Sequence, residues 1–368
     1  MRCTEAAGAR AAILRLSLSS FMGLVLVAAC AAPCAAREKS EPVARARYLM
    51  GSICQGYIPA GAAPDTAAAG EALAAAFDEI ARLEAVLSDY RADSELSRLN
   101  AAGPGAPVAC STDLFDFLAR SRELSEATSG AFDITVAPLI ALWDLRGAGR
   151  EATDDQVHAA LERVGWRRLK LDSGRRTARL ERPGMSLDPG AVGKGYALDA
   201  AVRVLRSRRV SAALLDFGGQ IMAIGAPRGQ GGWEVDIAHP LRRGEAALSV
   251  CVRDACISTS GNDQKGIVVN GRLLGHVLDP RSGRPITSSG SATVITPDAT
   301  SADALSTALL VLGQREGLRL AGREQVHAVF LDVDGPGELR VLATPGFPSI
   351  NAAAGACLLP PDSMGDRP

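Results

Sequence analysis

The spacing of hydrophobic and polar positions along the chain predicts a mixture of helices and strands. Between residues 65 and 88, apolar side chains recur about every 3.6 residues, which is the period of a helix with one buried face. These positions are Leu73, Phe77, Ile80, Leu83 and Leu87. A second helix is expected from Ser111 to near Gly130. A third begins at Thr153, where Thr153 and Gln156 have the form of a capping box, and Gly165 is expected to end it.

Short apolar runs separated by turn residues predict strands, mostly in the second half of the chain. The expected strands are residues 47–58, 212–217, 220–225, 233–238, 246–252, 267–270, 273–279, 290–296, 326–332 and 338–343. Residues 168–181 form an expected hairpin around Ser173-Gly174, and Asn270-Gly271 between two apolar runs is a strong hairpin signal. Two further helices are expected: one runs from the glycine-rich turn at 190–194 to about Ser207, and the other carries Asp303.

These elements indicate one compact α+β unit over residues 47–345, because that stretch contains neither an internal repeat nor a low-complexity linker. An arrangement of two subdomains with the site between them stays open. Residues 346–368 are expected to be a C-terminal tail.

The N-terminus has the pattern of an export signal. Arg2, Arg10 and Arg15 precede an apolar run from residue 16 to residue 29, too short to span a bilayer comfortably. The run ends in small residues before Cys30, as in the lipobox of bacterial lipoproteins. We therefore predict a signal peptide at 1–29, a lipid anchor on Cys30, a tether at 30–46 and a location on the periplasmic face of a membrane. Cleavage after Ala36, giving a soluble exported protein, and a retained anchor helix are the alternatives.

Composition narrows the function. The formal net charge is −1 and aromatic residues make up 4% of the chain, which argues against nucleic-acid binding. Five cysteines follow Cys34, and no spacing among them suggests zinc. Cys251 and Cys256 are close enough to form a disulfide across adjacent strands in an oxidising compartment, or they are simply small apolar side chains.

The first candidate for chemistry is the glycine-rich turn Asp188-Pro189-Gly190-Ala191-Val192-Gly193-Lys194-Gly195-Tyr196-Ala197. Its glycines allow backbone amides to approach an anion, the helix N-terminus favours negative charge, and Lys194 adds a positive charge. The turn is neither a Walker A loop nor a dinucleotide fingerprint. By itself it is consistent with phosphate binding or with a plain strand-to-helix turn.

The second candidate is Ser301-Ala302-Asp303-Ala304-Leu305-Ser306-Thr307. Asp303 and Thr307 share a helix face, and a carboxylate with a hydroxyl provides the hard oxygen ligands that Mg²⁺ prefers. The simpler interpretation is an acidic residue favoured by the helix dipole, with Thr307 packed beside it.

Three further segments have weaker signals. Ser258-Thr259-Ser260-Gly261-Asn262 resembles a hydroxyl-rich turn, and Asp133 lies either beside a ligand or at the cap of a turn. His276, before Asp279-Pro280, is either a general base or a structural histidine.

The order and spacing of these motifs resemble the ApbE family, the FAD:protein FMN transferases, which are commonly exported lipoproteins. The matching segments are Met50-Gly51, Ser88–Tyr90 with Asp93-Ser94, Gly130–Asp133, Asp188–Ala197, Asp216–Gly219, Ser258–Gly261, His276–Gly283 and Ala302–Thr307. They cover about residues 47–345. The resemblance implies an ApbE-like, T-fold-like architecture of mixed, largely antiparallel sheets flanked by helices.

The resemblance also implies an activity. Family members split FAD at its pyrophosphate, transfer the FMN half to a Ser or Thr hydroxyl of an exported or membrane-bound flavoprotein, and release AMP. Hydrolysis of FAD to FMN and AMP, or flavin binding without catalysis, are the alternatives for this chain.

Site residues follow from the same resemblance. It implies Mg²⁺ held by Asp303, Thr307 and the backbone oxygen of Ala191, with Ser306 as a further backbone contact. His276 is the implied catalytic base, acting with Lys194 and Asp303. The implied FAD contacts are Met50, Tyr90, Ala131, Phe132, Asp133, Asp188, Lys194 and Val277. Two departures from the family pattern are Pro189, which removes an amide donor from the turn, and Asn262-Asp263, which replaces an acidic-aromatic pair.

Overall fold

The computed structural model describes residues 40–242, 244–262, 267–269, 271–287, 290–333, 338–352 and 357–359. The predicted signal peptide at 1–29 and the predicted lipid-bearing Cys30 lie outside these residues. In the described part of the chain, no helix combines the length with the hydrophobicity that a membrane span requires.

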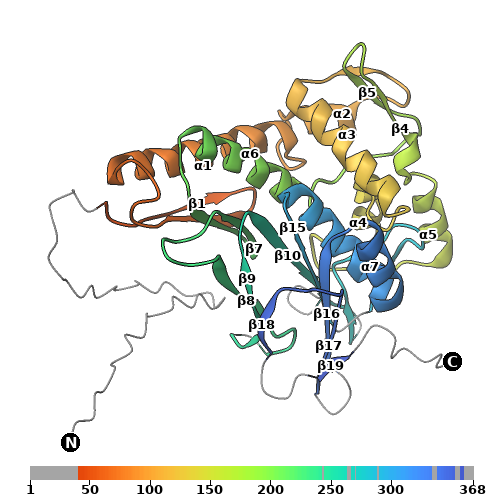
Figure 1. The fold of residues 1–368 in the computed structure, drawn as a ribbon. Coiled ribbons are helices and arrows are strands. Elements are labelled where there is room, and N and C mark those ends of the chain that lie inside the picture. The colour runs from red at the N-terminus through yellow and green to blue at the C-terminus, as the bar shows by residue number, and fades with distance from the viewer. Residues whose placement is uncertain are drawn as a thin grey trace, which may run out of the picture.

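A nine-stranded sheet is the centre of the molecule (Figure 1). Its strands, in spatial order, are β1 (Val43–Leu49), β2 (Ser52–Ile58), β6 (Ala213–Phe217), β7 (Gln220–Ile224), β10 (Ala255–Gly261), β15 (Ser291–Thr296), β16 (His327–Val333), β17 (Leu339–Ala343) and β19 (Cys357–Leu359). Neighbouring strands pair antiparallel, except that β19 runs parallel to β17.

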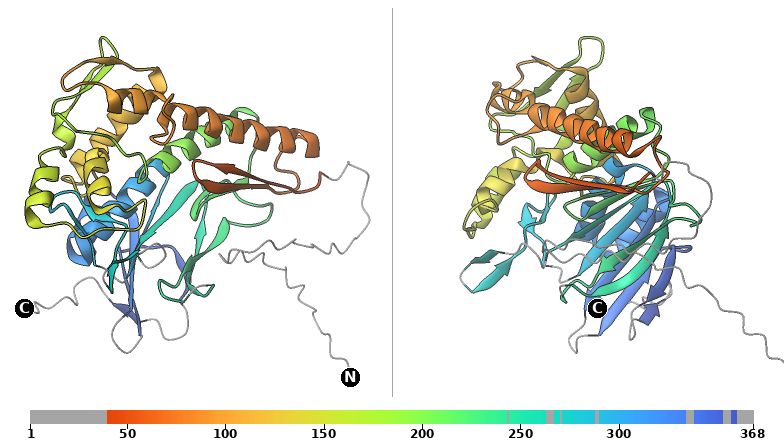
Figure 2. Two further views of the ribbon diagram at one scale, coloured as in Figure 1. Left: turned by 180° about the vertical axis from the view of Figure 1, so that it is seen from behind. Right: turned by 90° about the vertical axis from the view of Figure 1, so that its left-hand side faces the viewer.

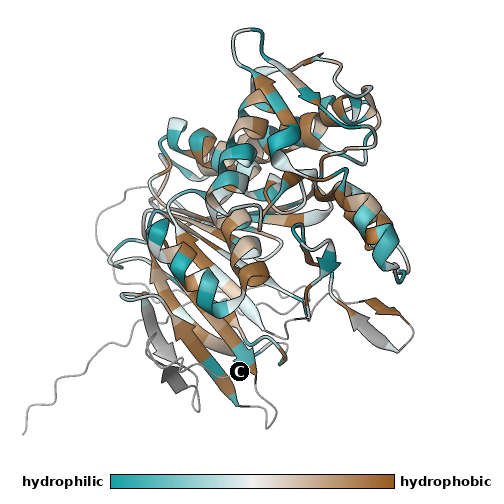
Figure 3. Ribbon diagram, turned by 90° about the vertical axis from the view of Figure 1, so that its right-hand side faces the viewer, coloured by the Kyte–Doolittle hydropathy of each residue, from teal (hydrophilic) through white to brown (hydrophobic). Residues whose placement is uncertain are grey.

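Three helices cover one face of this sheet, as Figures 1 and 2 show. They are α1 (Thr66–Leu87), α6 (Gly193–Ser207) and α7 (Ala299–Arg323). The helix α6 packs between α1 and α7, and α7 lies on β10 and β15. The backbone of α7 kinks at Gly313, whose φ of 73° is not helical. Figure 3 shows hydrophobic residues along the strands and alternating colours along the helices, as expected for helices with one buried face.

A second sheet covers part of the opposite face. It contains β8 (Trp233–Ala238), β9 (Ala246–Val252) and β18 (Ser349–Ala352). On β2, Gly56 faces α1, because a Cβ there would lie 2.6 Å from Leu73 Cδ2. Side chains alternate along a strand, so Tyr57 points to the other face. There it meets Trp233 of β8 edge-on, with 6.1 Å between the ring centroids.

The remaining helices form a second part of the molecule beside the row of α1, α6 and α7 (Figure 1). They are α2 (Glu95–Ala101), α3 (Thr112–Ala127), α4 (Ala137–Trp143) and α5 (Asp154–Leu161), with the 3-10 turns η1 (Ile134–Val136) and η2 (Trp166–Arg168). A three-stranded sheet of β3 (Val108–Ala109), β5 (Thr177–Leu180) and β4 (Leu169–Asp172) accompanies them. The main hydrophobic core extends into this part, and a smaller cluster forms around Leu139, Trp143 and Val157.

Two short hairpins complete the described structure. The pair β11 (Ile267–Val269) and β12 (Arg272–Leu274) confirms the hairpin that Asn270-Gly271 predicts, although Asn270 itself lies outside the described residues. The pair β13 (Leu278–Asp279) and β14 (Arg284–Pro285) follows.

The architecture confirms the predicted α+β class with largely antiparallel sheets and flanking helices. The helix predicted over 65–88 is α1, and Asp65 caps it by accepting a hydrogen bond from the Ala68 amide. Both hydrogen bonds of the predicted capping box at Thr153 are present. The predicted hairpin at 168–181 is the pair β4 and β5.

Several local predictions were wrong. Ser258–Gly261 belongs to β10, a central strand rather than a turn, because its hydroxyls are satisfied by partners on β15 and α7. The strand predicted over 47–58 is a hairpin that turns at Met50 and Gly51, both with positive φ. The strand predicted over 273–279 is interrupted, since residues 275–277 are in neither β12 nor β13.

Three boundaries also differ from the prediction. β1 begins at Val43, inside the predicted tether, and β18 and β19 lie inside the predicted tail. The helix α5 ends at Leu161, and Gly165 instead precedes η2.

The proposed disulfide is absent. Cys251 and Cys256 are free thiols, because β9 and β10 belong to different sheets and are not paired with each other.

The smaller cluster is joined to the segment after His276 by one buried hydrogen bond, in which Trp143 Nε1 donates to the Gly283 carbonyl at 2.8 Å. We predict that Trp143→Phe lowers the free energy of unfolding by about 1–3 kcal/mol, because the buried carbonyl loses its donor. Urea denaturation measures the change. Trp233→Phe, which removes a comparable bond from β8 of the second sheet to the Ile224 carbonyl of β7, is the matched comparison. Wild-type stability of the Trp143 variant would contradict the assignment.

Candidate functional site

The glycine-rich turn leads into the N-terminus of α6. The Asp188 amide donates to the Ile134 carbonyl at 2.8 Å, and the Gly190 amide donates to Asp188 Oδ1 at 2.6 Å. The Gly193 amide then donates to the Pro189 carbonyl at 2.7 Å. Proline has no amide donor, but the Pro189 carbonyl accepts a hydrogen bond within the turn.

Asp303 caps α6 from a different helix. Val192, the N-cap residue of α6, makes no side-chain capping bond. The third amide of the helix, that of Gly195, instead donates to Asp303 Oδ2 at 3.1 Å. Asp303 is 6% exposed, and its Oδ1 lies 3.8 Å from Lys194 Nζ. A side-chain oxygen on that amide is what an N-cap residue normally provides, so Asp303 of α7 replaces the missing cap of α6.

In the same way, Asp199 of α6 caps the N-terminus of α7. It accepts hydrogen bonds from the amides of Ala299 and Thr300, at 2.8 and 2.9 Å, and from the Thr300 hydroxyl. Burial raises the pKa of Asp199, and the bonds from Thr300 and Ala299 oppose that rise. Asp298, the N-cap of α7, accepts from the Ser301 amide. Asp303 is therefore not the helix-dipole residue of α7, since Asp298 and Asp199 already serve its first turn.

The N-terminal ends of α6 and α7 are in direct contact. A Cβ at position 195 would lie 2.2 Å from the Ala299 carbonyl oxygen, which explains the glycine there. That carbonyl also accepts a hydrogen bond from Gln220 Nε2 at 2.8 Å, which ties the junction to the sheet.

Hydroxyls from β10 and α7 meet beside Asp303. Ser306 Oγ donates to the Asp303 carbonyl at 3.0 Å. Ser258 Oγ and Ser260 Oγ lie 3.2 and 2.9 Å from Ser306 Oγ, and Ser260 Oγ also lies 3.2 Å from Thr307 Oγ1. A hydroxyl has one proton, so Ser306 accepts from the two β10 serines. These contacts hold the Asp303–Thr307 face of α7 against the sheet.

The donor set is compatible with Mg²⁺. Asp303 provides a carboxylate and Thr307 a hydroxyl, while the Ala191 carbonyl belongs to the turn that precedes α6. The described residues hold no group of three or more His, Cys, Asp or Glu side chains that could bind a metal ion. One carboxylate with neutral oxygens is a weak cage for a cation alone. It fits Mg²⁺ that also binds substrate phosphates and water.

The segment that carries His276 is fixed to the end of β10. Asn262, directly after β10, accepts from the Val277 amide at 3.3 Å and donates to the Ile286 carbonyl at 2.9 Å. A Cβ on Gly275 would lie 2.6 Å from Asn262 Nδ2, so the approach is close. The Asn262 departure from the family pattern thus has a structural role, while Asp263 lies outside the described residues. His276 is half-buried in this segment.

Met50 and Tyr90 border the glycine-rich turn. Met50 Cε is 3.4 Å from the position of a Cβ on Gly193, which places the side chain at the start of α6. Tyr90 is 77% exposed, and the Arg146 guanidinium lies over its ring, 4.4 Å from the centroid. Arg146 also bonds to Asp188. Burial raises the pKa of Asp188, and the charge of Arg146 opposes that rise.

Residues 131–133 lie deeper than the prediction of FAD contacts suggests. Ala131 and Phe132 are 1% and 2% exposed. The Asp133 carboxylate accepts from the amide and hydroxyl of Thr135 and from the amide of Trp166. These bonds oppose the rise in the Asp133 pKa that burial causes. Asp133 therefore fixes the turn beside Asp188, and its contact with FAD stays a prediction.

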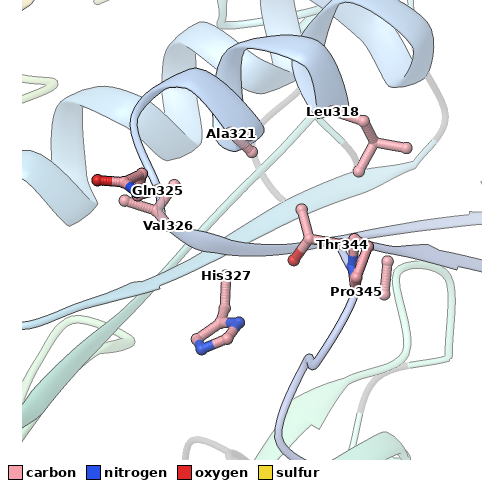
Figure 4. A pocket seen from close by; sticks show the side chains of 9 residues that line it. Leu318, Ala321, Gln325, Val326, His327, Thr344 and Pro345 are labelled. Atoms are coloured by element: carbon pink, nitrogen blue, oxygen red, sulfur yellow. The ribbon is translucent and has the colours of Figure 1, made fainter.

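Two cavities have walls made mainly of other residues. One of about 360 Å³ is formed by the C-terminal end of α7 with Val326, His327 and Thr344 (Figure 4). Another of about 310 Å³ lies between α3 and the start of α7, near Arg120 and Ser301. Neither is lined by a predicted site residue.

Sequence reasoning missed Asp199, Arg146 and the role of Gln220. Asp199 has a weak signal, since it follows Gly195 by one helical turn and so shares its face of α6. Nothing in the sequence points to Arg146 or Gln220, because their partners are distant in the chain.

Comparisons with known sequences and structures all match the same family. A sequence model of the ApbE family matches residues 50–330. The chain is 33% identical over 304 residues to the FAD:protein FMN transferase of Treponema pallidum (strain Nichols), covering 78% of this chain and 83% of that protein. It is 33% identical over 261 residues to the FAD:protein FMN transferase of Escherichia coli (strain K12), covering 68% of this chain and 73% of that protein. The apo form of the Pseudomonas stutzeri flavinyl transferase ApbE superposes with a TM-score of 0.74 at 29% identity, covering 83% of this chain and 96% of that one.

The capping pair predicts an effect on stability. We expect Asp199→Ala to lower the free energy of unfolding by about 2 kcal/mol, because the first two amides of α7 lose their acceptor. Asp199→Asn, which keeps one oxygen, should lose less, and so should Asp298→Ala, which removes one capping bond, that from the Ser301 amide, and an ion pair with Arg120 at 3.9 Å. Equilibrium urea denaturation tests the order; equal losses for Asp199→Ala and Asp298→Ala would contradict it.

Proposed function

The chain belongs to the ApbE family, and from this premise we propose that it transfers the FMN half of FAD to a hydroxyl of a protein acceptor. It is a transferase with FAD as substrate. The acceptor is a flavoprotein with an accessible Ser or Thr side chain.

One observation supports this reaction above the others: Lys194 and Asp303 meet where α6 begins, and the Thr307 hydroxyl lies one turn along α7, 3.4 Å from the Asp303 carbonyl oxygen. The N-terminus of α6 is a favourable place for phosphate oxygens, because the helix dipole is positive there. Lys194 Nζ, 3.8 Å from Asp303 Oδ1, adds a positive charge at the same place. A pyrophosphate bound there has both charge compensation and nearby oxygen ligands for a metal.

The chemical step exchanges a phosphoanhydride bond of FAD for a phosphate ester bond to the acceptor. The acceptor hydroxyl oxygen forms a bond to the FMN phosphorus, and the bond from that phosphorus to the bridging oxygen breaks. AMP leaves with the bridging oxygen and its electron pair. His276 takes the proton of the acceptor hydroxyl, and Lys194 offsets the charge that grows on the leaving phosphate.

We propose that Asp303, Thr307 and the backbone oxygen of Ala191 hold Mg²⁺. Bound there, the ion supplies Lewis-acid stabilisation of the phosphoryl oxygens. Hydrogen bonds fix the positions of these residues. Asp303 accepts from the Gly195 amide in the first turn of α6, and the hydroxyls of Ser260 and Thr307 are hydrogen-bonded to each other.

The decisive experiment uses the purified protein with FAD, Mg²⁺ and a flavoprotein subunit of the same organism. Mass spectrometry and AMP release are measured together. Covalent FMN on the acceptor with an equal amount of AMP supports the proposal. Free FMN and AMP alone would show an FAD pyrophosphatase, and unchanged FAD with tight binding would show a flavin-binding protein without catalysis.

Export and lipid anchoring are proposed on the pattern of residues 1–30 alone. We expect the mature chain to begin at a lipidated Cys30 and to face the periplasm. Intact-mass and N-terminal peptide mass spectrometry of the native protein checks this. A mature N-terminus after Ala36 without lipid would show a soluble exported protein instead.

We predict that Asp303→Ala abolishes FMN transfer, because it removes both the carboxylate ligand and the cap on Gly195. Activity is measured with Mg²⁺ and after treatment with a chelator. Asp78→Ala is the matched control, since the Asp78 side chain is 70% exposed and forms only a surface ion pair. Full activity of Asp303→Ala in chelator-treated buffer would refute the metal assignment.

A further inference from the structure

Arg146 lies at the tip of a rigid turn beside the glycine-rich turn. It follows α4, where Asp144 has a φ of 50°. The amides of Gly147 and Gly149 both donate to the Asp144 carbonyl, and the Ala148 amide donates to the Asp144 side chain. The backbone that carries Arg146 is therefore fixed by local hydrogen bonds.

The Arg146 guanidinium makes three contacts at once. It bonds to the carboxylates of Asp89 and Asp188, whose side chains are 10% and 6% exposed. It also lies 4.4 Å from the centroid of the Tyr90 ring. Two buried carboxylates fix the orientation of the guanidinium plane, and that plane in turn covers one face of the ring.

Tyr90 is otherwise exposed, at 77% of its surface. The contact with Arg146 covers one ring face, so a planar molecule can stack on the other. A flexible exposed tyrosine would lose side-chain entropy when it stacks on a ligand. A tyrosine already held by a cation has less freedom to lose, which favours binding.

We propose that Arg146 is a positioning residue that holds Tyr90 as a stacking platform for a planar ring of FAD. This inference rests on the proposed function. It assigns a role to a residue that lies outside the motifs of the family resemblance, and it identifies the aromatic rings of the dinucleotide as the groups that this part of the site recognises.

The positive charge of Arg146 also favours FAD binding. Without Arg146, Asp89 and Asp188 would be two adjacent carboxylates close to the expected position of a pyrophosphate, and like charges there oppose anion binding. Arg146 compensates for them. Because Asp188 also accepts from the Gly190 amide, the same guanidinium connects the platform to the glycine-rich turn.

Lysine should not replace this arginine. A lysine keeps the positive charge near Asp89 and Asp188 and so preserves the fold. Arg146 bonds to both carboxylates through the single nitrogen Nη2, which an ammonium group can imitate, but a lysine lacks the planar guanidinium that stacks on the ring. Arg146→Lys therefore separates the charge from the geometry.

The test is the affinity for FAD, measured by titration calorimetry with wild type, Arg146→Ala and Arg146→Lys. We expect both variants to bind about tenfold more weakly, about 1.4 kcal/mol, while thermal unfolding shows that Arg146→Lys remains folded. Arg91→Ala is the matched control, because Arg91 follows Tyr90 directly but pairs only with Asp93, itself 74% exposed. It should bind FAD as wild type does.

A double-mutant cycle with Tyr90→Ala separates positioning from a general structural effect. If Arg146 acts through Tyr90, the double variant of Tyr90→Ala with Arg146→Lys, which keeps the charge, binds FAD no more weakly than Tyr90→Ala alone. Additive losses would overturn the proposal, as would wild-type affinity of Arg146→Lys. Titrations with FMN and with AMP identify which ring stacks on Tyr90, since only that half-ligand should respond to Arg146→Lys, which keeps the charge.

The outcomes also separate this inference from the proposed function. A wild-type protein that does not bind FAD refutes the transferase proposal and the platform together. A wild-type protein that binds and transfers FMN, with Arg146 variants of equal affinity, overturns only the role of Arg146.

Discussion

The site depends on the reciprocal capping of two helices. Asp303 of α7 accepts the Gly195 amide at the start of α6, and Asp199 of α6 accepts the first two amides of α7. Neither helix can move without leaving buried backbone donors unsatisfied, which is costly. The contact is possible only because position 195 lacks a Cβ. The N-terminal ends of two helices, both positive, are thus held side by side.

This arrangement gives the carboxylate of Asp303 two tasks. One oxygen caps α6, while the other lies on the side of Lys194. The structural task fixes the position that the proposed metal-binding task needs, so the site is organised before any ligand binds. The sheet contributes through β10, whose serines hold the same face of α7, and through Gln220, which anchors the Ala299 carbonyl.

The second part of the molecule provides the other side of the site. Its turn at residues 131–135 bonds to the amide of Asp188, and Asn262 holds the segment of His276 at the end of β10. Arg146 joins this part to the loop that carries Tyr90. The main hydrophobic core nevertheless includes residues of both parts.

Many helices, strands and turns of this fold could be predicted from short-range sequence patterns. The 3.6-residue apolar period specified α1, turn residues specified the hairpin of β4 and β5, and Thr153 with Gln156 specified the start of α5, because each signal acts over a few residues. The Ser258–Gly261 strand was misread, since hydroxyls favour turns unless distant partners satisfy them. By itself, the sequence determined the elements and named Lys194, Asp303, Thr307 and His276. Only the tertiary structure decided that Asp199 and Gln220 fix the start of α7 and that Arg146 fixes Asp188, because those contacts join residues from 42 to 101 positions apart, and no local pattern records such a pairing.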